Sequence, residues 1–347
     1  MITVFVHQNG QTNIVERVEP AWLDPAASAV LWVDMAAPGD EEHRLLRDVF
    51  RFHPLSIEDA VSALQYPKVE AYPGYLYVVL HGIDPKPISA KPGERGGATP
   101  AGKGGPRPPG ESGPQHTPFA TRDIDFFLGR NFLVTVHDGE SRSVSVVRDV
   151  CTRHEHALAE GPVALLHRIV DRMIDNYQPV FEEVENRIGR LEEQAFAGHE
   201  RLSRQVMKLK REVATMRRVL VPQRDAIGRL ARREFPSISD EMTYRFRDVY
   251  DHVVRLTEEA MLFQDRITGI FEVNLSTVSY RLNQVMKLLT VMSTIFLPLT
   301  VLTGMWGMNI ALPHFPGGPD VQFWWILLLM LAIGAAMLAF FRRSKWI

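Results

Sequence analysis

The chain has 347 residues, a formal net charge of −2 and a single cysteine. The near-neutral charge gives no indication of nucleic-acid binding. A single cysteine cannot form an intrachain disulfide. The lack of such bonds is usual for proteins of a reducing compartment. The first residues lack a basic stretch followed by a long apolar run, so no signal peptide is expected. We therefore expect the large N-terminal region to stay in the cytosol.

Residues 1–142 are predicted to form a cytosolic α/β domain. Runs of β-branched and aromatic residues predict strands, and helical patterns occupy 39–52 and 54–64, so strands alternate with helices. The predicted strands are 2–6, 29–33, 75–80, 124–128 and 132–136. Residues 85–118 interrupt this pattern with nine prolines and eight glycines, a composition that predicts a disordered insertion.

Residues 143–287 are predicted to be a cytosolic helical region that ends in a long stalk helix. Ser237, Ser239 and Asp240 are typical of a helix start, and no proline occurs from Asp240 to Leu297. A helix over this stretch would span roughly 87 Å. We expect it to continue without a break into the membrane.

Two uncharged segments near the C-terminus are long enough to cross a bilayer. Residues 288–306 and 321–341 contain 19 and 21 residues, and about 20 suffice. Basic residues precede the first segment and follow the second, whereas the loop 310–320 has no lysine or arginine. The positive-inside rule predicts that both termini, including the basic tail 342–347, are cytoplasmic and that the loop is external.

The first membrane segment is expected to run to 309, and small or polar residues follow one of its faces. They recur at alternating steps of four and three, so they stay on one face of a supercoiled helix. Such a face can line a water path or allow close helix packing, and spacing alone leaves both open. Partner chains would be needed, which predicts a symmetric homo-oligomer. The face consists of Glu272, Ser276, Ser279, Asn283, Met286, Thr290, Ser293, Leu297, Thr300 and Gly304.

The tripeptide Gly307-Met308-Asn309 follows this segment and its Phe-x-Pro-Leu-Thr pattern. Together with Pro67-Lys-Val-Glu70 and the stretch from Phe246 to His252, it resembles the CorA family of magnesium transporters over nearly the whole chain. The resemblance implies an α+β membrane protein of the cell inner membrane, a lipid-embedded homopentamer with one axial pore. It does not imply an enzyme.

The resemblance also implies roles for individual residues. Gly307, Met308 and Asn309 would form the selectivity filter, where an amide ring can bind the waters that Mg²⁺ retains. Leu289 and Leu297 would be apolar constrictions. The implied pore-lining residues are Glu272, Asn283, Leu289, Ser293, Leu297, Thr300 and Gly304.

Regulation is implied at two cytosolic carboxylates. Asp248 matches a ligand position for intracellular Mg²⁺, and Asp84 of the adjoining subunit is the expected partner. Bound metal would neutralise facing carboxylates and hold the channel closed, which gives negative feedback.

The external loop departs from the family pattern. His314 stands where the family usually has an acidic residue, and Asp320 is the only carboxylate of the loop. Imidazole favours zinc, cobalt or nickel. We expect influx of Mg²⁺, with Co²⁺ or Ni²⁺ as further ions, down the membrane potential. The alternatives are a zinc transporter of the same superfamily, proton-coupled or not, and a membrane-anchored metal sensor or scaffold.

Overall fold

The computed structural model describes residues 1–24, 27–62, 65–83, 121–139, 141–154, 157–197, 202–308, 319–344 and 346. The predicted insertion at 85–118 lies outside these residues. The chain forms two compact units. The first is Met1–Glu193 with Ser203–Ile270, and the second is Gln194–Leu202 with Phe271–Ile347.

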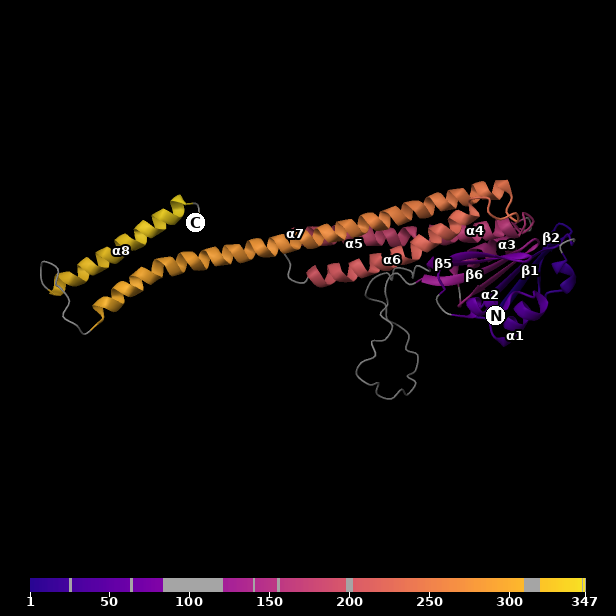
Figure 1. The fold of residues 1–347 in the computed structure, drawn as a ribbon, viewed down its shortest axis with the longest axis horizontal. Coiled ribbons are helices and arrows are strands. Elements are labelled where there is room, and N and C mark those ends of the chain that lie inside the picture. The colour runs from indigo at the N-terminus through magenta and orange to yellow at the C-terminus, as the bar shows by residue number, and fades with distance from the viewer. Residues whose placement is uncertain are drawn as a thin grey trace, which may run out of the picture. The chain divides into compact units, whose positions relative to one another are not determined.

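A seven-stranded sheet forms the base of the first unit, with strand order β2-β1-β3-β7-β6-β5-β4 (Figure 1). β3 and β7 pair in parallel, and every other neighbouring pair is antiparallel. The strands are β1 (Ile2–Gln8), β2 (Gln11–Val15), β3 (Val30–Ala36), β4 (Lys68–Tyr72), β5 (Tyr75–Ile83), β6 (Thr121–Gly129) and β7 (Phe132–His137). The five predicted strands are present. Sequence reasoning missed β2 and β4, which lie at the two edges and bury few side chains.

Helices cover both faces of this sheet. On one face, Val33, Tyr77 and Val134 belong to a core that also contains Leu46 and Phe52. The covering elements are α1 (Asp40–Arg44), a π-helical turn η2 (Leu45–Val49) and α2 (Pro54–Val61), so the helix predicted at 39–52 is in fact two short elements. A 3₁₀ turn, η1 (Pro20–Leu23), precedes β3.

The other face packs against α4 (Pro162–Asp175), which follows α3 (Arg142–Arg153). Met173 lies 3.6 Å from the position that a Cβ on Gly82 would occupy. The hydroxyl of Tyr177 donates a 2.7 Å hydrogen bond to the carbonyl of His81. These contacts fix α4 on the sheet, with one of its helical faces free to meet another helix.

The first unit is completed by most of α5 (Gln178–Ala197), by nearly all of α6 (Leu202–Leu230) and by the beginning of α7 (Asp240–Trp306). Arg187 pairs with the buried Glu212 at 2.8 Å, which joins α5 to α6. Arg266 pairs with Glu192 at 2.9 Å, which joins α7 to α5. Loss of Arg187 would be strongly destabilising, because it would leave the buried Glu212 carboxylate without its partner.

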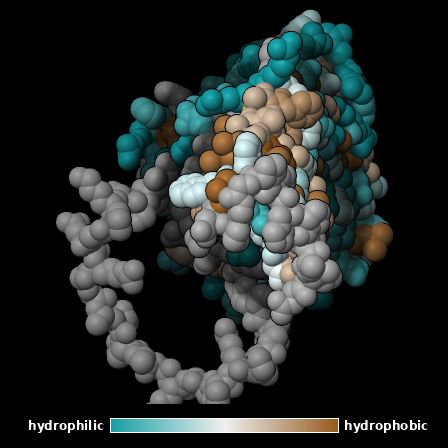
Figure 2. All heavy atoms as spheres, turned by 90° about the vertical axis from the view of Figure 1, so that its left-hand side faces the viewer, coloured by the Kyte–Doolittle hydropathy of each residue, from teal (hydrophilic) through white to brown (hydrophobic). Residues whose placement is uncertain are grey.

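α7 begins at Asp240, as predicted, and passes through Pro298 without a break. The second unit contains its later part and α8 (Pro319–Arg343). Both helices are long and apolar enough to cross a membrane, and only 6% and 0% of the residues in their most apolar 18-residue windows are buried. Figure 2 shows apolar surface over the ends of these helices. The predicted fold class, an α/β domain with a long helix and two apolar spans, is confirmed.

Candidate functional site

α7 and α8 contact each other through one face of each helix. Val291 and Phe341 are 5% and 6% exposed, and Lys287 lies over the ring of Trp346. The other partly buried residues of the two spans recur at steps of three and four on the same faces. On α7 they include Ile295, Pro298, Leu302 and Trp306, and on α8 Gln322, Ile326, Met330, Ile333 and Met337.

The polar face of α7 points away from α8. All ten residues of the predicted face, from Glu272 to Gly304, are exposed. At about 100° per residue, the stretch from Thr290 to Gly304 lies roughly 150° around α7 from the face that contacts α8. The second helix of the hairpin therefore leaves this face uncovered.

The threonines of this face present oxygen acceptors rather than donors. Thr290 donates its hydroxyl hydrogen to the carbonyl of Met286, and Thr300 donates to the carbonyl of Phe296, both at 2.8 Å. A hydroxyl oxygen keeps its acceptor lone pairs after it has donated. The face can thus accept hydrogen bonds from water or coordinate cations, which is the polarity that a cation path requires.

The geometry at the end of α7 explains why a glycine stands at position 307 of the predicted filter. The Gly307 nitrogen donates to the Thr303 carbonyl at 2.9 Å. A Cβ on Gly307 would stand only 3.1 Å from that same carbonyl oxygen, so a larger residue would press against the last turn. Gly307 and Met308 are exposed. Asn309 lies outside the described residues, so the filter stays a prediction.

The remaining predicted positions are placed as follows. Leu289 and Leu297 are 61% and 69% exposed in a single chain, and their role as constrictions stays a prediction. His314 lies outside the described residues. Asp320 belongs to the first turn of α8, and its role in the loop stays a prediction.

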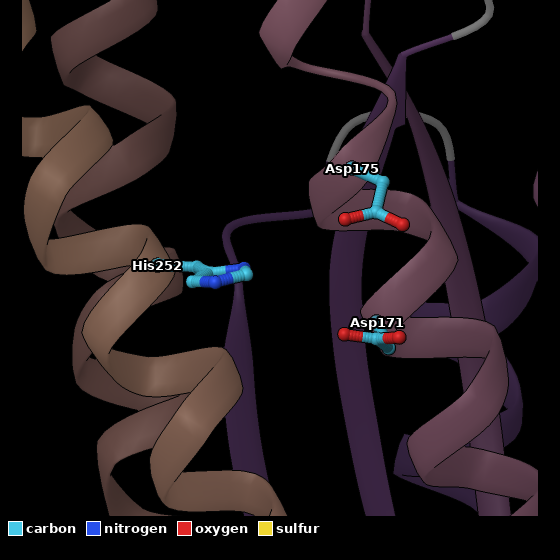
Figure 3. Close-up of side chains that lie close together, drawn as sticks. All are labelled: Asp171, Asp175 and His252. Carbon is cyan, nitrogen blue, oxygen red and sulfur yellow. The ribbon is translucent and has the colours of Figure 1, made fainter.

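A second candidate site lies in the first unit, between α4 and α7. Asp171 and Asp175 of α4 face His252 of α7 (Figure 3). One ligand atom from each of these three side chains lies within 4.8 Å of the others. This is the one such group of metal-ligating residues among those that the structure describes. A spacing of four residues brings the side chains of Asp171 and Asp175 to the same face of α4.

Asp248 adds negative charge to this group. It lies one turn before His252 on α7, and it is exposed. Partial burial raises the pKa of Asp171, and the charges of Asp175 and Asp248 raise it further. A divalent cation would relieve this repulsion. Arg172 lies 3.5 Å from Asp175 and would compete for that carboxylate.

The sequence alone pointed to only one residue in or beside this candidate metal site. Asp248 was predicted as a regulatory ligand, whereas Asp84, its predicted partner, lies outside the described residues. Asp171, Asp175 and His252 were missed, because acidic pairs four residues apart are common on helix surfaces. The pairing of such a spacing on α4 with the Asp248–His252 spacing on α7 was the available signal.

Comparisons with known proteins agree with this architecture. The family model described as CorA-like Mg²⁺ transporter protein matches residues 107–343. The chain is 30% identical to YfjQ of Bacillus subtilis, a candidate metal ion transporter, over 98% of this chain and 95% of that one. It is 28% identical to the cobalt/magnesium transport protein CorA of Thermotoga maritima, over 86% of this chain and 78% of that one.

The fold is likewise similar to the CorA magnesium transporter of Methanocaldococcus jannaschii. The TM-score is 0.77 at 19% identity, and the match covers 100% of this chain and 99% of that one. The family model and the curated relatives define the class of the chain, which is a membrane protein that transports metal ions. The chain belongs to the CorA family of divalent cation transporters.

Proposed function

We propose that five copies of the chain surround one axial pore, through which Mg²⁺ enters the cell. The observation that carries this proposal is the exposed polar face of α7, which lies opposite the face that contacts α8. One such face cannot enclose a path, but symmetric copies can. The hydroxyl oxygens of Thr290 and Thr300 would then line the path as acceptors.

Hydrated Mg²⁺ suits a path of neutral acceptors. The ion gives up its waters reluctantly, and neutral oxygens can bind those waters without holding the ion too tightly for release. We assign the first contact from outside to a ring of Asn309 amides after Gly307 and Met308. Inside the cell, Glu272 would attract cations at the pore mouth.

The membrane potential supplies the driving force. With both termini in the cytoplasm of a cell inner membrane, a divalent ion that moves inward gains about 4.6 kcal/mol per 100 mV, twice the value for one elementary charge. A gated passive channel is sufficient for uptake, so no energy-coupling site is required.

We assign the gate's sensor to the group of Asp171, Asp175 and His252 with Asp248 beside it. Cytosolic cations bound there would neutralise crowded carboxylates and stabilise one arrangement of α4 and α7, the closed one. When the cations leave, repulsion returns and favours opening. Feedback of this kind limits uptake once the cytosolic concentration is restored.

Flux into liposomes tests the proposal. Purified protein should carry Mg²⁺ inward when the inside is negative, and Asn309→Ala should abolish flux without changing the assembled mass. No flux from the unaltered protein would favour a membrane-anchored metal sensor or scaffold. Normal flux from Asn309→Ala would remove Asn309 from the filter.

A second candidate ion class is supported by His252 and His314. Imidazole ligands favour Zn²⁺, Co²⁺ and Ni²⁺ over Mg²⁺, and the relative from Thermotoga maritima is named for cobalt as well as magnesium. Parallel flux measurements with these ions, with and without a proton gradient, distinguish the two. Zinc uptake that rises with an inward proton gradient would favour the zinc transporter.

A further inference from the structure

A basic groove lies in the first unit, where α6 ends and α7 begins. It has a volume of about 620 Å³ and is lined by both helices and the turn between them. Its floor is formed by Gly228, Ala231 and the ring of Tyr250, and Arg232, Arg233 and Arg247 surround it. Asp251 is its one acidic lining residue, so the groove has a clear excess of positive charge.

Two of these guanidinium groups have no acidic partner among the described residues. Arg233 pairs with Asp240 at 3.0 Å. Arg247 instead lies over the ring of Tyr244, 5.3 Å from its centroid. For Arg232, as for Arg247, no described carboxylate oxygen comes within 4.0 Å. Arginine presents a planar fork of donors that matches phosphate, so these two groups are available for an anion.

The floor of the groove depends on a glycine. A Cβ on Gly228 would stand 3.0 Å from Cε2 of Tyr250 and 3.7 Å from a terminal nitrogen of Arg232. An added Cβ would press on the tyrosine ring, whereas its distance from the guanidinium is that of ordinary contact. The missing side chain therefore leaves an aromatic surface next to an unpaired guanidinium.

The turn that carries the arginines is itself unusual. Arg233 follows the end of α6 with a φ of +60°, a left-handed conformation that favours glycine or asparagine at this position. An arginine in this conformation places a third positive group at the groove.

We propose that this groove binds a nucleoside di- or triphosphate. The phosphates would lie on Arg232 and Arg247, and the base or ribose would lie on the apolar floor beside the Tyr250 ring. The volume of the groove is within the range of about 300–1,000 Å³ for small-molecule sites. This volume is larger than one phosphate group requires. Stacking on an aromatic ring is the usual contact for a base.

The test is calorimetric titration of the full-length protein in detergent with ATP, in EDTA so that cation sites stay empty. The unaltered protein should bind ATP saturably, with one site per chain. Arg232→Gln and Arg247→Gln should each weaken binding at least tenfold, as expected for loss of a hydrogen bond between charged groups. Arg218→Gln is the matched control, because Arg218 is an exposed arginine of α6 outside the groove.

A second experiment distinguishes binding of a whole nucleotide from binding of its phosphates alone. Tyr250→Leu should weaken ATP binding several-fold and leave the binding of inorganic tripolyphosphate unchanged. Equal affinity for ATP and tripolyphosphate would overturn the assignment of a nucleotide. Absence of saturable ATP binding, or an equal loss in Arg218→Gln, would overturn the proposal. Melting temperatures of all variants check that they fold, and metal flux is not needed for any of these outcomes.

Discussion

The ammonium group of Lys287 lies 5.9 Å from the centroid of the Trp346 ring. Lys287 precedes the apolar part of α7, and Trp346 follows α8. A cation over an indole ring contributes about 0.5–1 kcal/mol at an exposed site, and both side chains prefer the boundary between lipid and water. The contact therefore brings the basic ends of the two spans to one side of the hairpin.

Labelling of introduced cysteines tests on which side of the membrane the basic ends of α7 and α8 lie. The natural Cys151 is buried and can be replaced by alanine to give a clean background. A membrane-impermeant maleimide applied to intact cells should label Gly317→Cys, in the predicted external loop, and should not label Ser344→Cys after α8. Permeabilised cells should show both labels. The reverse pattern would mean that the basic ends face outward.

Thr300 and Thr294 offer a matched pair for the ion path. Both donate their hydroxyls to a carbonyl of the preceding turn at 2.8 Å, but only Thr300 belongs to the polar face. Thr300→Val should lower Mg²⁺ flux at least several-fold, because each chain loses one acceptor oxygen that contributes about 0.5–1.5 kcal/mol. Thr294→Val should change flux little.

Flux through liposomes, normalised to assembled protein, is the measurement for this pair. Equal effects of the two substitutions would indicate that the hydroxyls act only within the helix. A larger effect of Thr294→Val would place the path on a different face of α7.

The elements that the sequence predicted well are those with local signals. The buried strands β5 and β7 have continuous apolar runs, and α7 has a clear start and no proline before Pro298. The edge strand β4 alternates charged and apolar residues as a half-buried strand does, but with only five residues the pattern is too short to stand out from a loop. The polar face of α7 was predictable because one helix carries all of it.

The cation group between α4 and α7 was not predictable in the same way. Its ligands come from two helices far apart in the chain, and only tertiary packing brings them together. Asp248 was found by resemblance to a motif. The partners that surround it required the structure.

The cation group predicts a binding defect that can be measured without transport. Asp171→Asn should weaken binding of Co²⁺ to the full-length protein in detergent roughly tenfold or more, since one ligand loses its charge. Asp265→Asn, at an exposed carboxylate of the same helix α7, is the control. Titration calorimetry measures the affinity.

Feedback should follow binding in the same variants. Asp171→Asn should shift inhibition of flux by internal cations to higher concentration, whereas Asp265→Asn should not. Weakened binding with unchanged inhibition would show that the group binds cations but does not gate. Unchanged binding would remove Asp171 from the ligands.

The buried carboxyl of Asp125 predicts a pH dependence of stability. Burial raises its pKa from 3.8 to about 7, opposed by the hydrogen bond that it accepts from Tyr77 and aided by the charge of Asp123. The folded protein therefore holds this proton more tightly than the unfolded chain does. The protonated Asp125 carboxyl therefore contributes fully to stability below about pH 4, and this contribution is lost as the pH rises through about 7.

Asp125→Asn keeps an acceptor for the Tyr77 hydroxyl, whose oxygen lies 2.5 Å from a carboxylate oxygen of Asp125. The substitution also replaces the titrating carboxyl with an amide that does not ionise. The variant should melt at a higher temperature than the unaltered protein at pH 8, and the two should converge near pH 4.5. Asp149→Asn, at an exposed carboxylate of α3, should follow the unaltered protein throughout. Melting temperatures of the full-length protein in detergent between pH 4.5 and 8 measure this. A constant difference between Asp125→Asn and the unaltered protein across that range would mean that Asp125 stays ionised when folded, with its charge stabilised by the hydrogen bond from Tyr77.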